Sequence, residues 1–108
     1  MKLIFEWDTQ KARANSKKHR VSFQEAKTVF NDPLLLTYPD DLHSETEERY
    51  ISIGYSSQRR ILLVVHTERM TGKEILIRII SCRKATVRER KIYEEPSEWN
   101  RDVAGIRF

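Results

Sequence analysis

Hydrophobic and polar residues near the N-terminus first alternate and then repeat at helical spacing. The alternation over residues 2–6 predicts a short strand, and the stretch from residue 9 to about residue 18 is typical of a helix. Asp8 stands where an N-cap is expected, and basic residues lie at the C-terminal end, where the helix dipole favours cations. One side of this predicted helix carries Ala12, Asn15 and His19.

A second helix is predicted directly afterwards. Ser22 and Glu25 have the spacing of a capping box, in which each side chain bonds the backbone of the other residue. Apolar positions then recur on one side of the helix, at Phe23, Ala26, Val29 and Phe30. The Asn-Asp-Pro sequence at residues 31–33 ends the helix because proline cannot continue it.

The middle of the chain has strand character. In order, it contains predicted strands over residues 34–38, 49–55, 61–67 and 74–82, with polar turns over residues 56–58 and 70–73 before the last two strands. Turns this short make neighbouring strands antiparallel, so we expect a meander. The apolar run 61–65 belongs at the centre of the sheet, where both faces are covered.

The spacing becomes helical again near the C-terminus. Thr86 and Glu89 form a second predicted capping box, which opens a basic helix that Pro96 ends. Residues 96–108 contain enough apolar side chains to dock, either on this chain or on a partner. We therefore predict an α+β fold with two N-terminal helices, an antiparallel meander and a C-terminal helix. Residues 1–95 form a single domain and residues 96–108 form a tail.

Composition narrows the class of protein. A chain of 108 residues is the size of one small domain. No apolar stretch reaches the roughly 18 residues that cross a bilayer, and Glu6 interrupts the N-terminal apolar residues too early for a signal peptide. Cys82 is the single cysteine, which excludes an internal disulfide framework and a cysteine-based zinc site. We expect a folded protein of the cytoplasm that makes no membrane contact.

The net charge of +4 conceals a strong segregation of charge along the chain. Residues 57–93 hold ten Lys and Arg against three acids, whereas residues 31–56 hold one against six. A segment this basic attracts polyanions, and nucleic acid is the natural candidate. Solvated faces that serve only solubility also carry charge runs, so the basic segment needs further support.

An acidic loop is the first place to look for a metal site. Its candidate ligands are Asp40, Asp41, His43 and Glu45. Their spacing matches no calcium loop, and a zinc site would need further nitrogen or sulfur ligands. We therefore expect a polar surface loop, with no metal and no cofactor. Gly54 and Gly72 stand alone, so there is no glycine-rich phosphate loop either.

Arginines at the ends of predicted strands are the strongest chemical signal. If the 70–73 turn has a tight tip, Arg69 pairs with Glu74 and Val65 pairs with Arg78. That register places Arg69 and Arg78 on one face of the sheet and His66 and Glu68 on the other. A slip of one residue would instead place His66 and Glu68 beside Arg78.

Several guanidinium groups aimed at one phosphate favour metal-free cleavage of RNA. They donate paired hydrogen bonds and stabilise the negative charge that develops when a ribose 2′-hydroxyl attacks its own phosphodiester. DNA lacks this nucleophile. A softer group must take and return the proton, and the candidates are His19, His66, Glu68 and Tyr93. Each of the four also has a structural interpretation, as a core residue or an ion-paired residue.

Several segments together resemble a known family. The N-terminal ones are residues 5–8 (Phe-Glu-Trp-Asp), 18–26 (Lys-His-Arg-Val-Ser-Phe-Gln-Glu-Ala) and 29–33 (Val-Phe-Asn-Asp-Pro). The later ones are residues 43–44, 47–49, 67–69 and 78–85, followed by Glu89 and Tyr93. In this order they resemble the signature of BrnT toxins from residue 3 to about residue 95. Arg20 departs from the signature, which usually has glycine after the histidine.

The resemblance implies a toxin of a type II toxin–antitoxin system, with a RelE-like fold, that cleaves RNA and arrests translation. It implies neutralisation by a BrnA-type antitoxin, in a complex of two toxins and two antitoxins that contacts operator DNA through the antitoxin. By similarity, the catalytic candidates are Arg69, Arg83, Glu68 and His19. The candidates for RNA contact are Lys18, Arg78, Lys84, Arg88 and Tyr93.

A second hypothesis keeps the basic face but not the catalysis. The chain is then a binding module for nucleic acid or for an acidic protein, or a co-repressor that acts with its partner. No recognition-helix signature supports direct binding to operator DNA. The two hypotheses differ in whether the purified chain cleaves RNA.

Overall fold

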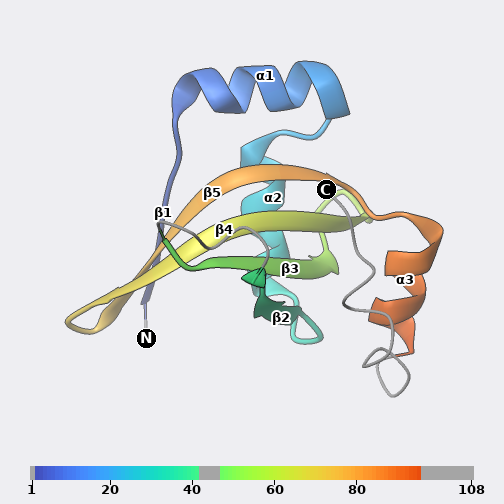
Figure 1. Ribbon diagram of the computed structural model, residues 1–108. Helices are drawn as coiled ribbons and strands as arrows, with labels where there is room; N and C mark the ends of the chain where they lie inside the picture. Colours follow the sequence, from blue (N-terminus) through green and yellow to red (C-terminus); the bar gives the residue numbers. More distant parts are fainter. Residues whose placement is uncertain (1, 42–46, 96–108) are drawn as a thin grey trace.

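The computed structural model describes residues 2–41 and 47–95, and its elements follow the predicted order (Figure 1). The helices are α1 (Thr9–His19), α2 (Phe23–Thr28), the 3-10 helix η1 (Val29–Asn31) and α3 (Val87–Glu94). The strands are β1 (Lys2–Glu6), β2 (Leu36–Pro39), β3 (Arg49–Tyr55), β4 (Ile61–Thr71) and β5 (Glu74–Lys84). The α+β prediction is confirmed. His43, Glu45 and the predicted tail 96–108 lie outside the described residues.

The five strands form one sheet in the order β1-β5-β4-β3-β2. Strands β2 to β5 are antiparallel neighbours, but β1 lies parallel to β5. The prediction of a purely antiparallel sheet is therefore wrong at this edge. β1 takes this place because Leu3 and Phe5 pack against the core, and because two helices carry the chain away before the meander begins. A parallel pairing needs such a long connection.

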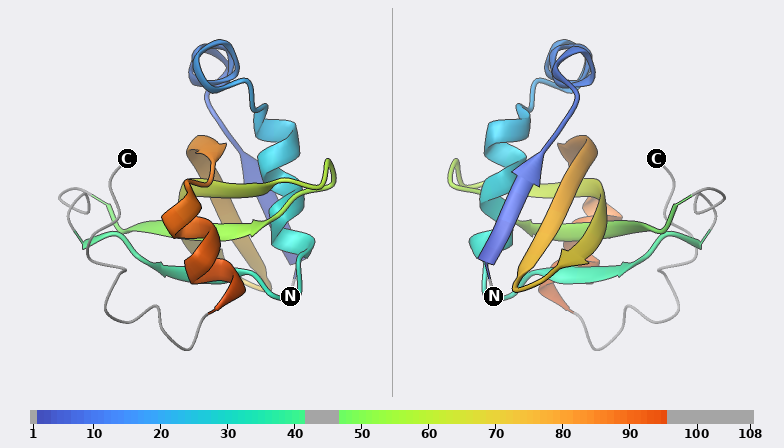
Figure 2. Two further views of the ribbon diagram at one scale, coloured as in Figure 1. Left: turned by 90° about the vertical axis from the view of Figure 1, so that its right-hand side faces the viewer. Right: turned by 90° about the vertical axis from the view of Figure 1, so that its left-hand side faces the viewer.

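Helices cover both faces of the sheet and create two hydrophobic cores (Figure 2). On the α2 face the core comprises Val21, Phe23, Ala26, Val29, Leu62, Val64, Ile77, Ile79 and Cys82. On the α3 face it comprises Tyr38, Ile51, Ile53, Leu63, Val65 and Ile92. Successive residues of β4 enter opposite cores, which confirms that the run 61–65 lies at the sheet centre with both faces covered.

The β4–β5 hairpin is longer than predicted. Its strands pair as far as Thr71 and Glu74, so Gly72 and Lys73 form the turn. Gly72 has a φ of 61°, which glycine adopts without the steric strain of a side chain. Arg69 consequently lies within β4 and does not terminate it, contrary to expectation.

The hairpin register preserves the predicted face but not the predicted partners. Arg69 pairs with Leu76, and Arg78 pairs with Thr67. Because side chains two residues apart on a strand share a face, Arg69 lies on the same face as Thr67 and therefore as Arg78. The shared face is confirmed, whereas the specific pairs expected from the sequence are wrong.

A β-bulge interrupts this hairpin. Val65 pairs with Ser81 and the next residue, His66, pairs with Ile79. Ile80 is therefore an extra residue on β5 with no partner of its own. The extra residue shifts the alternation of β5 side chains by one position. Two residues on opposite sides of the bulge therefore share a face when they are an odd number of positions apart.

Asn15 fastens α1 to β5. Its Nδ2 donates to the carbonyl oxygen of Val21 at 3.0 Å, and its Oδ1 accepts from the backbone N–H of Cys82 at 3.0 Å. Both ends of this buried amide are satisfied, as a buried polar group requires. Ala12 and His19 are partly buried on the same side, which confirms the predicted inner side of this helix.

The predicted caps of α1 and α3 are confirmed. The Asp8 carboxylate accepts from the N–H of Lys11 at 3.0 Å. Thr86 Oγ1 accepts from the N–H of Glu89 at 3.2 Å, and the Glu89 carboxylate accepts from the N–H of Thr86 at 2.8 Å. Among the described helices, none is long and apolar enough to span a membrane.

The capping box predicted for α2 is only half formed. Ser22 Oγ accepts from the N–H of Glu25 at 3.0 Å, but the Glu25 carboxylate pairs with Arg60 and accepts from Ser56 Oγ at 2.7 Å. Burial by itself would raise the pKa of Glu25, but the hydrogen bonds from Arg60 and Ser56 lower it below its usual range. A charged group buried here requires a cationic partner, so the distant arginine replaces the local cap.

Arg20 ends α1 in the left-handed conformation, with φ 57° and ψ 34°. A side chain in this conformation costs about 1 kcal/mol relative to glycine. We expect Arg20→Gly to raise the free energy of unfolding by roughly 0.5 to 1 kcal/mol, measured by urea titration. Arg20→Ala retains the Cβ atom and is the control. An equal gain from both substitutions would show that backbone strain is not the cause.

Candidate functional site

The sheet brings arginines from three strands together on the α3 face. Glu6 of β1 pairs with Arg78 of β5, which pairs with Thr67 of β4. Thr67 in turn pairs with Arg49 of β3. Arg69 is two residues further along β4 and lies on the same face. Three guanidinium groups therefore come from positions that surround Thr67.

A cleft of about 240 Å³ opens at this place, and we call it the arginine cleft. It is lined by Glu6, Glu47, Glu48, Thr67, Glu68, Arg69, Leu76 and Arg78. The prediction from sequence named three of these residues, Arg69, Arg78 and Glu68. Arg49 does not line the cleft but lies next to it, paired with Thr67; the prediction missed it, although it stands in the 47–49 segment that carries the family resemblance.

Two of these arginines, Arg78 and Arg49, pair with exposed carboxylates. Arg78 Nη1 lies 2.8 Å from Glu6 Oε2, and both side chains are 43% exposed. Arg49 Nε lies 3.9 Å from Glu47 Oε1. Ion pairs this exposed contribute little to stability, so a phosphate group that accepts paired hydrogen bonds can replace the carboxylate.

Glu68 lines the cleft, but its side chain leaves β4 on the face opposite Arg69, the face that also carries His66. Burial raises its pKa above the usual range. Its Oε1 lies 3.8 Å from Nδ1 of the buried His66. A carboxylate of raised pKa binds a proton more strongly, which favours a role as general base.

His66 is a structural residue and not an accessible base. Its side chain is fully buried, Nε2 lies 2.7 Å from Ser52 Oγ, and Ser52 Oγ lies 2.7 Å from Thr37 Oγ1. The ring stacks on Tyr50 and meets the edge of Phe30. Burial lowers the pKa of His66 to about 4, so the ring is neutral at physiological pH.

Tyr93 also has a structural role in this fold. Its hydroxyl donates to Asp32 Oδ2, which also accepts from the backbone N–H of Tyr55 at 2.8 Å. Burial, followed by the hydrogen bond to Asp32, raises the pKa of Tyr93 to about 12. The hydroxyl therefore holds α3 against the end of η1 and the end of β3, and it is poorly suited to release a proton.

Arg83 lies on the α3 face but is far from the arginine cleft. Its two terminal nitrogens donate to the two carboxylate oxygens of Glu89, at 2.7 and 2.9 Å. The Glu89 side chain is 3% exposed and the Arg83 side chain is 19% exposed. Arg83 and Arg78 are five residues apart on β5, roughly 16 Å along the strand. The predicted convergence of strand-end arginines therefore holds for Arg69 and Arg78 and not for Arg83.

His19 and Lys18 belong to this second end of the sheet. Burial, together with the positive charges of Lys18 and Arg83, lowers the pKa of His19 below its usual range. His19 is partly buried and does not line the arginine cleft. The four residues predicted to be catalytic thus divide into two groups, with Arg69 and Glu68 at the cleft and His19 and Arg83 at the opposite end.

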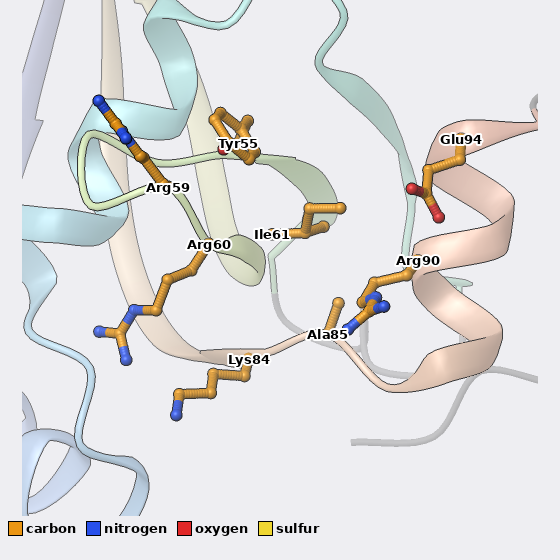
Figure 3. Close-up of a pocket in the computed structure, with 8 residues that line it drawn as sticks. All are labelled: Tyr55, Arg59, Arg60, Ile61, Lys84, Ala85, Arg90 and Glu94. Atoms are coloured by element: carbon orange, nitrogen blue, oxygen red, sulfur yellow. The ribbon is translucent and has the colours of Figure 1, made fainter.

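A second cleft, of about 360 Å³, lies between the β3–β4 turn and α3, and we call it the basic hollow (Figure 3). It is lined by Tyr55, Arg59, Arg60, Ile61, Lys84, Ala85, Arg90 and Glu94. Lys84 was predicted from the sequence to contact RNA. The other three cations were missed, although they lie in the basic segment 57–93. Arg88 is exposed on α3 and lines neither cleft.

Within residues 2–41 and 47–95, no three His, Cys, Asp or Glu side chains are placed to hold a metal ion. Of the acidic loop, Asp40 and Asp41 are described and the other two candidate ligands are not. The absence of a metal site in that loop stays a prediction.

The buried neutral histidine makes stability depend on pH. The pKa of His66 is about 4 in the folded chain and about 6.5 when unfolded. Between these values only the unfolded chain binds the proton, so stability is lost as the pH falls from 6.5 to 4, by up to about 3 kcal/mol. Urea titrations at pH 7.5 and pH 4.5 should show this loss, and His66→Gln should show a smaller one. An identical pH dependence in the variant would contradict this assignment.

Removing Arg83 should destabilise the domain as well as alter its charge. Arg83→Ala leaves the buried Glu89 carboxylate without its guanidinium, which we expect to cost about 3 kcal/mol in a denaturant titration. The double variant with Glu89→Gln should recover part of that loss. A stability equal to that of the unmodified chain in Arg83→Ala would show that the pair is not structural.

Comparison with known proteins shows that the chain is similar to a protein family and to a solved structure. A family model described as the ribonuclease toxin BrnT of type II toxin–antitoxin systems matches residues 7–89. The crystal structure of the Brucella abortus ribonuclease toxin BrnT is similar, with a TM-score of 0.56 and 23% sequence identity over 80% of this chain and 99% of that one. At this identity the likeness establishes the α+β fold.

None of the curated protein sequences compared with the chain matches it. Because the family model spans most of the chain, the protein belongs to the BrnT family of ribonuclease toxins of type II toxin–antitoxin systems.

Proposed function

We propose that the arginine cleft is the active site of a metal-independent endoribonuclease, in which a ribose 2′-hydroxyl attacks the adjacent phosphodiester. The observation that carries this proposal is the position of Arg49, Arg69 and Arg78 around Thr67 on one sheet face. Arg69 and Arg78 line a cleft that Glu68, an acid of raised pKa, also lines. Family membership supports ribonuclease activity in general.

The arginines stabilise the charge that develops on the phosphate. Arg69 and Arg78 line the cleft, and each can donate two hydrogen bonds to phosphate oxygens. Arg78 exchanges the Glu6 carboxylate for the phosphate, and Arg49 exchanges Glu47. Because these groups are positioned by strands, they need little reorganisation as the charge on the phosphate increases.

We assign the general base to Glu68, which lines the cleft and reaches it around the edge of β4 that β3 leaves unpaired beyond Thr67. It accepts the proton of the 2′-hydroxyl while the bond from the 2′-oxygen to phosphorus forms. The bond from phosphorus to the 5′-oxygen breaks, and that oxygen takes a proton from water. The hydroxide left behind takes the proton from Glu68, which regenerates the water and the carboxylate. The products are a 2′,3′-cyclic phosphate and a 5′-hydroxyl, with no net consumption of water or of protons.

The predicted residues outside the cleft receive narrower roles. We assign Lys18, Lys84 and Arg88 to electrostatic attraction of the RNA, and His19 to the same end of the sheet. Arg83 positions α3 through the buried carboxylate of Glu89, and Tyr93 does so through the partly buried carboxylate of Asp32.

Membership of a type II family implies an antitoxin protein as partner. We propose that this partner is of the BrnA type, that two toxins and two antitoxins assemble, and that operator DNA is contacted through the antitoxin. RNA cleavage by the free toxin then arrests translation in the cytoplasm, and residues 1–95 form one RelE-like domain. The order of the resembling segments in the sequence supports these proposals.

Substitutions in the cleft test this function. Arg69→Ala and Arg78→Ala should each slow RNA cleavage by about 100-fold or more, because each removes a donor to the developing charge. Glu68→Gln should slow it similarly and abolish the rise in rate with pH that ionisation of Glu68 produces. The assay is cleavage of RNA in a chelator, with the DNA of the same sequence in parallel and the product ends identified.

Arg13→Ala, an exposed charge on α1, is the matched control and should leave cleavage unchanged. Cyclic phosphate ends from RNA alone support the proposal. Undiminished cleavage by both cleft variants would move the active site elsewhere. No cleavage of RNA by the unmodified chain would favour the non-catalytic binding module instead.

A further inference from the structure

The basic hollow lies on the same sheet face as the arginine cleft but at the other end. Tyr55 is two residues from Ile53 and Arg49 is two residues from Ile51, and both isoleucines belong to the core under α3. Arg49 and Tyr55 therefore mark two ends of one face of β3, about 20 Å apart along the strand. A single-stranded polyanion of sufficient length can reach both places.

The charges of the hollow are spread out, and most are available. Arg60 is neutralised by the buried carboxylate of Glu25. Arg59, Lys84 and Arg90 form no ion pair with any residue described in the structure. Figure 3 shows that Arg90 extends from α3 towards Ala85, while the other cations come from the turn and from the end of β5, so the charged ends do not converge. This arrangement suits several successive phosphates better than one small anion.

The turn that carries Arg59 is rigid. Ser56 is buried, its backbone N–H donates to the carbonyl of Arg60 at 2.8 Å, and its carbonyl accepts from the N–H of Arg59 at 3.0 Å. Ser56 Oγ donates to the Glu25 carboxylate at 2.7 Å. Arg59 is held with a φ of 62°, a conformation that disfavours a side chain. Glycine would suit this backbone better, so the presence of arginine is unexplained by folding alone and is consistent with a functional role.

An aromatic ring lies beside these charges. Tyr55 is 45% exposed and lines the hollow, while its backbone N–H is fixed by Asp32. Single-stranded nucleic acid is typically bound by cations that follow the backbone and by aromatic rings on which bases stack. An acidic protein segment would use the cations but has no comparable requirement for the exposed ring.

We propose that the basic hollow is a second RNA-binding subsite, which holds the sugar–phosphate backbone of the substrate several nucleotides from the scissile phosphate and stacks one base on Tyr55. This inference rests on the proposed ribonuclease function and extends it. At a stacked spacing of about 3.4 Å per nucleotide, the 20 Å between the two sites corresponds to about six nucleotides at most. Substrates shorter than this span can occupy one site but not both.

Binding measurements test the subsite without cleavage. The probe is a fluorescent 12-nucleotide RNA whose riboses are 2′-O-methylated, so that it lacks the attacking hydroxyl. Arg59→Glu and Arg90→Glu should each weaken binding by about tenfold and reduce the salt dependence, because each removes a phosphate contact. Arg13→Glu makes the same charge change on α1, lines neither cleft and should have a much smaller effect. Tyr55→Leu should weaken binding with no change in salt dependence.

Two further variants separate binding from folding and from catalysis. Arg59→Gly should leave the domain at least as stable, because it relieves the left-handed backbone, and should still weaken RNA binding. In cleavage assays, Arg59→Glu should raise KM for a 12-nucleotide RNA and leave cleavage of a trinucleotide unchanged.

Each outcome is decisive for the subsite. Binding of the methylated RNA that is unaffected by the hollow variants overturns it. Intact RNA binding together with lost binding of the antitoxin overturns it too and makes the hollow a site for an acidic protein. RNA binding that depends on the hollow, without any RNA cleavage by the unmodified chain, would retain the subsite and reject the proposed nuclease function.

Discussion

The β-bulge at Ile80 is the constraint on which the arrangement of functional side chains depends. Without it, regular alternation along β5 would place Arg78 and Arg83 on opposite faces of the sheet. With it, Ile79 and Cys82 both enter the core under α2, and both arginines face α3. The physical reason is apolar burial. Ile79 and Cys82 are each 1% exposed, and burying side chains of this kind contributes roughly 2 kcal/mol each, more than the roughly 1 kcal/mol of a ladder hydrogen bond lost at the bulge.

The arginines of the basic segment fall into two classes according to the burial of their partners. Arg60 and Arg83 pair with carboxylates that are almost fully buried, so these pairs connect the β3–β4 turn to α2 and the end of β5 to α3. Losing either cation would leave a buried carboxylate without a cationic partner. Arg78 pairs with a carboxylate as exposed as itself, and Arg59 and Arg90 form no ion pair within the described residues. Only cations of the second class can replace their present contacts with a phosphate group. For this reason the two clefts, and not the most buried arginines, are the candidate binding sites.

Elements whose signals are local were predictable, and contacts between distant segments were not. The caps at Asp8 and Thr86 involve residues three positions apart, so their geometry is readable from the sequence. Glu25 shows the same local signal but pairs with an arginine 35 residues away, because a buried carboxylate needs a cation more than it needs a cap. The parallel placement of β1 had no local signal either, since it depends on the long helical connection that follows. For the site, alternation was enough to predict that Arg69 and Arg78 share a face, but the turn was assigned too many residues and the strand partners were therefore wrong.

The sequence by itself determined the order of helices and strands, the two-sided burial of β4, the strongly basic segment and the resemblance to BrnT toxins. These properties follow from residue type and short-range spacing. The tertiary structure decided which charged side chains meet: Arg49 beside Thr67, Arg83 held by Glu89, and Arg59 across a hollow from α3. Those contacts depend on strand register and on one bulge. Both are set by the packing of side chains that are far apart in the chain. The spacing of residues along the sequence does not reveal this packing energy. It therefore identifies the arginines but not the residues that they contact.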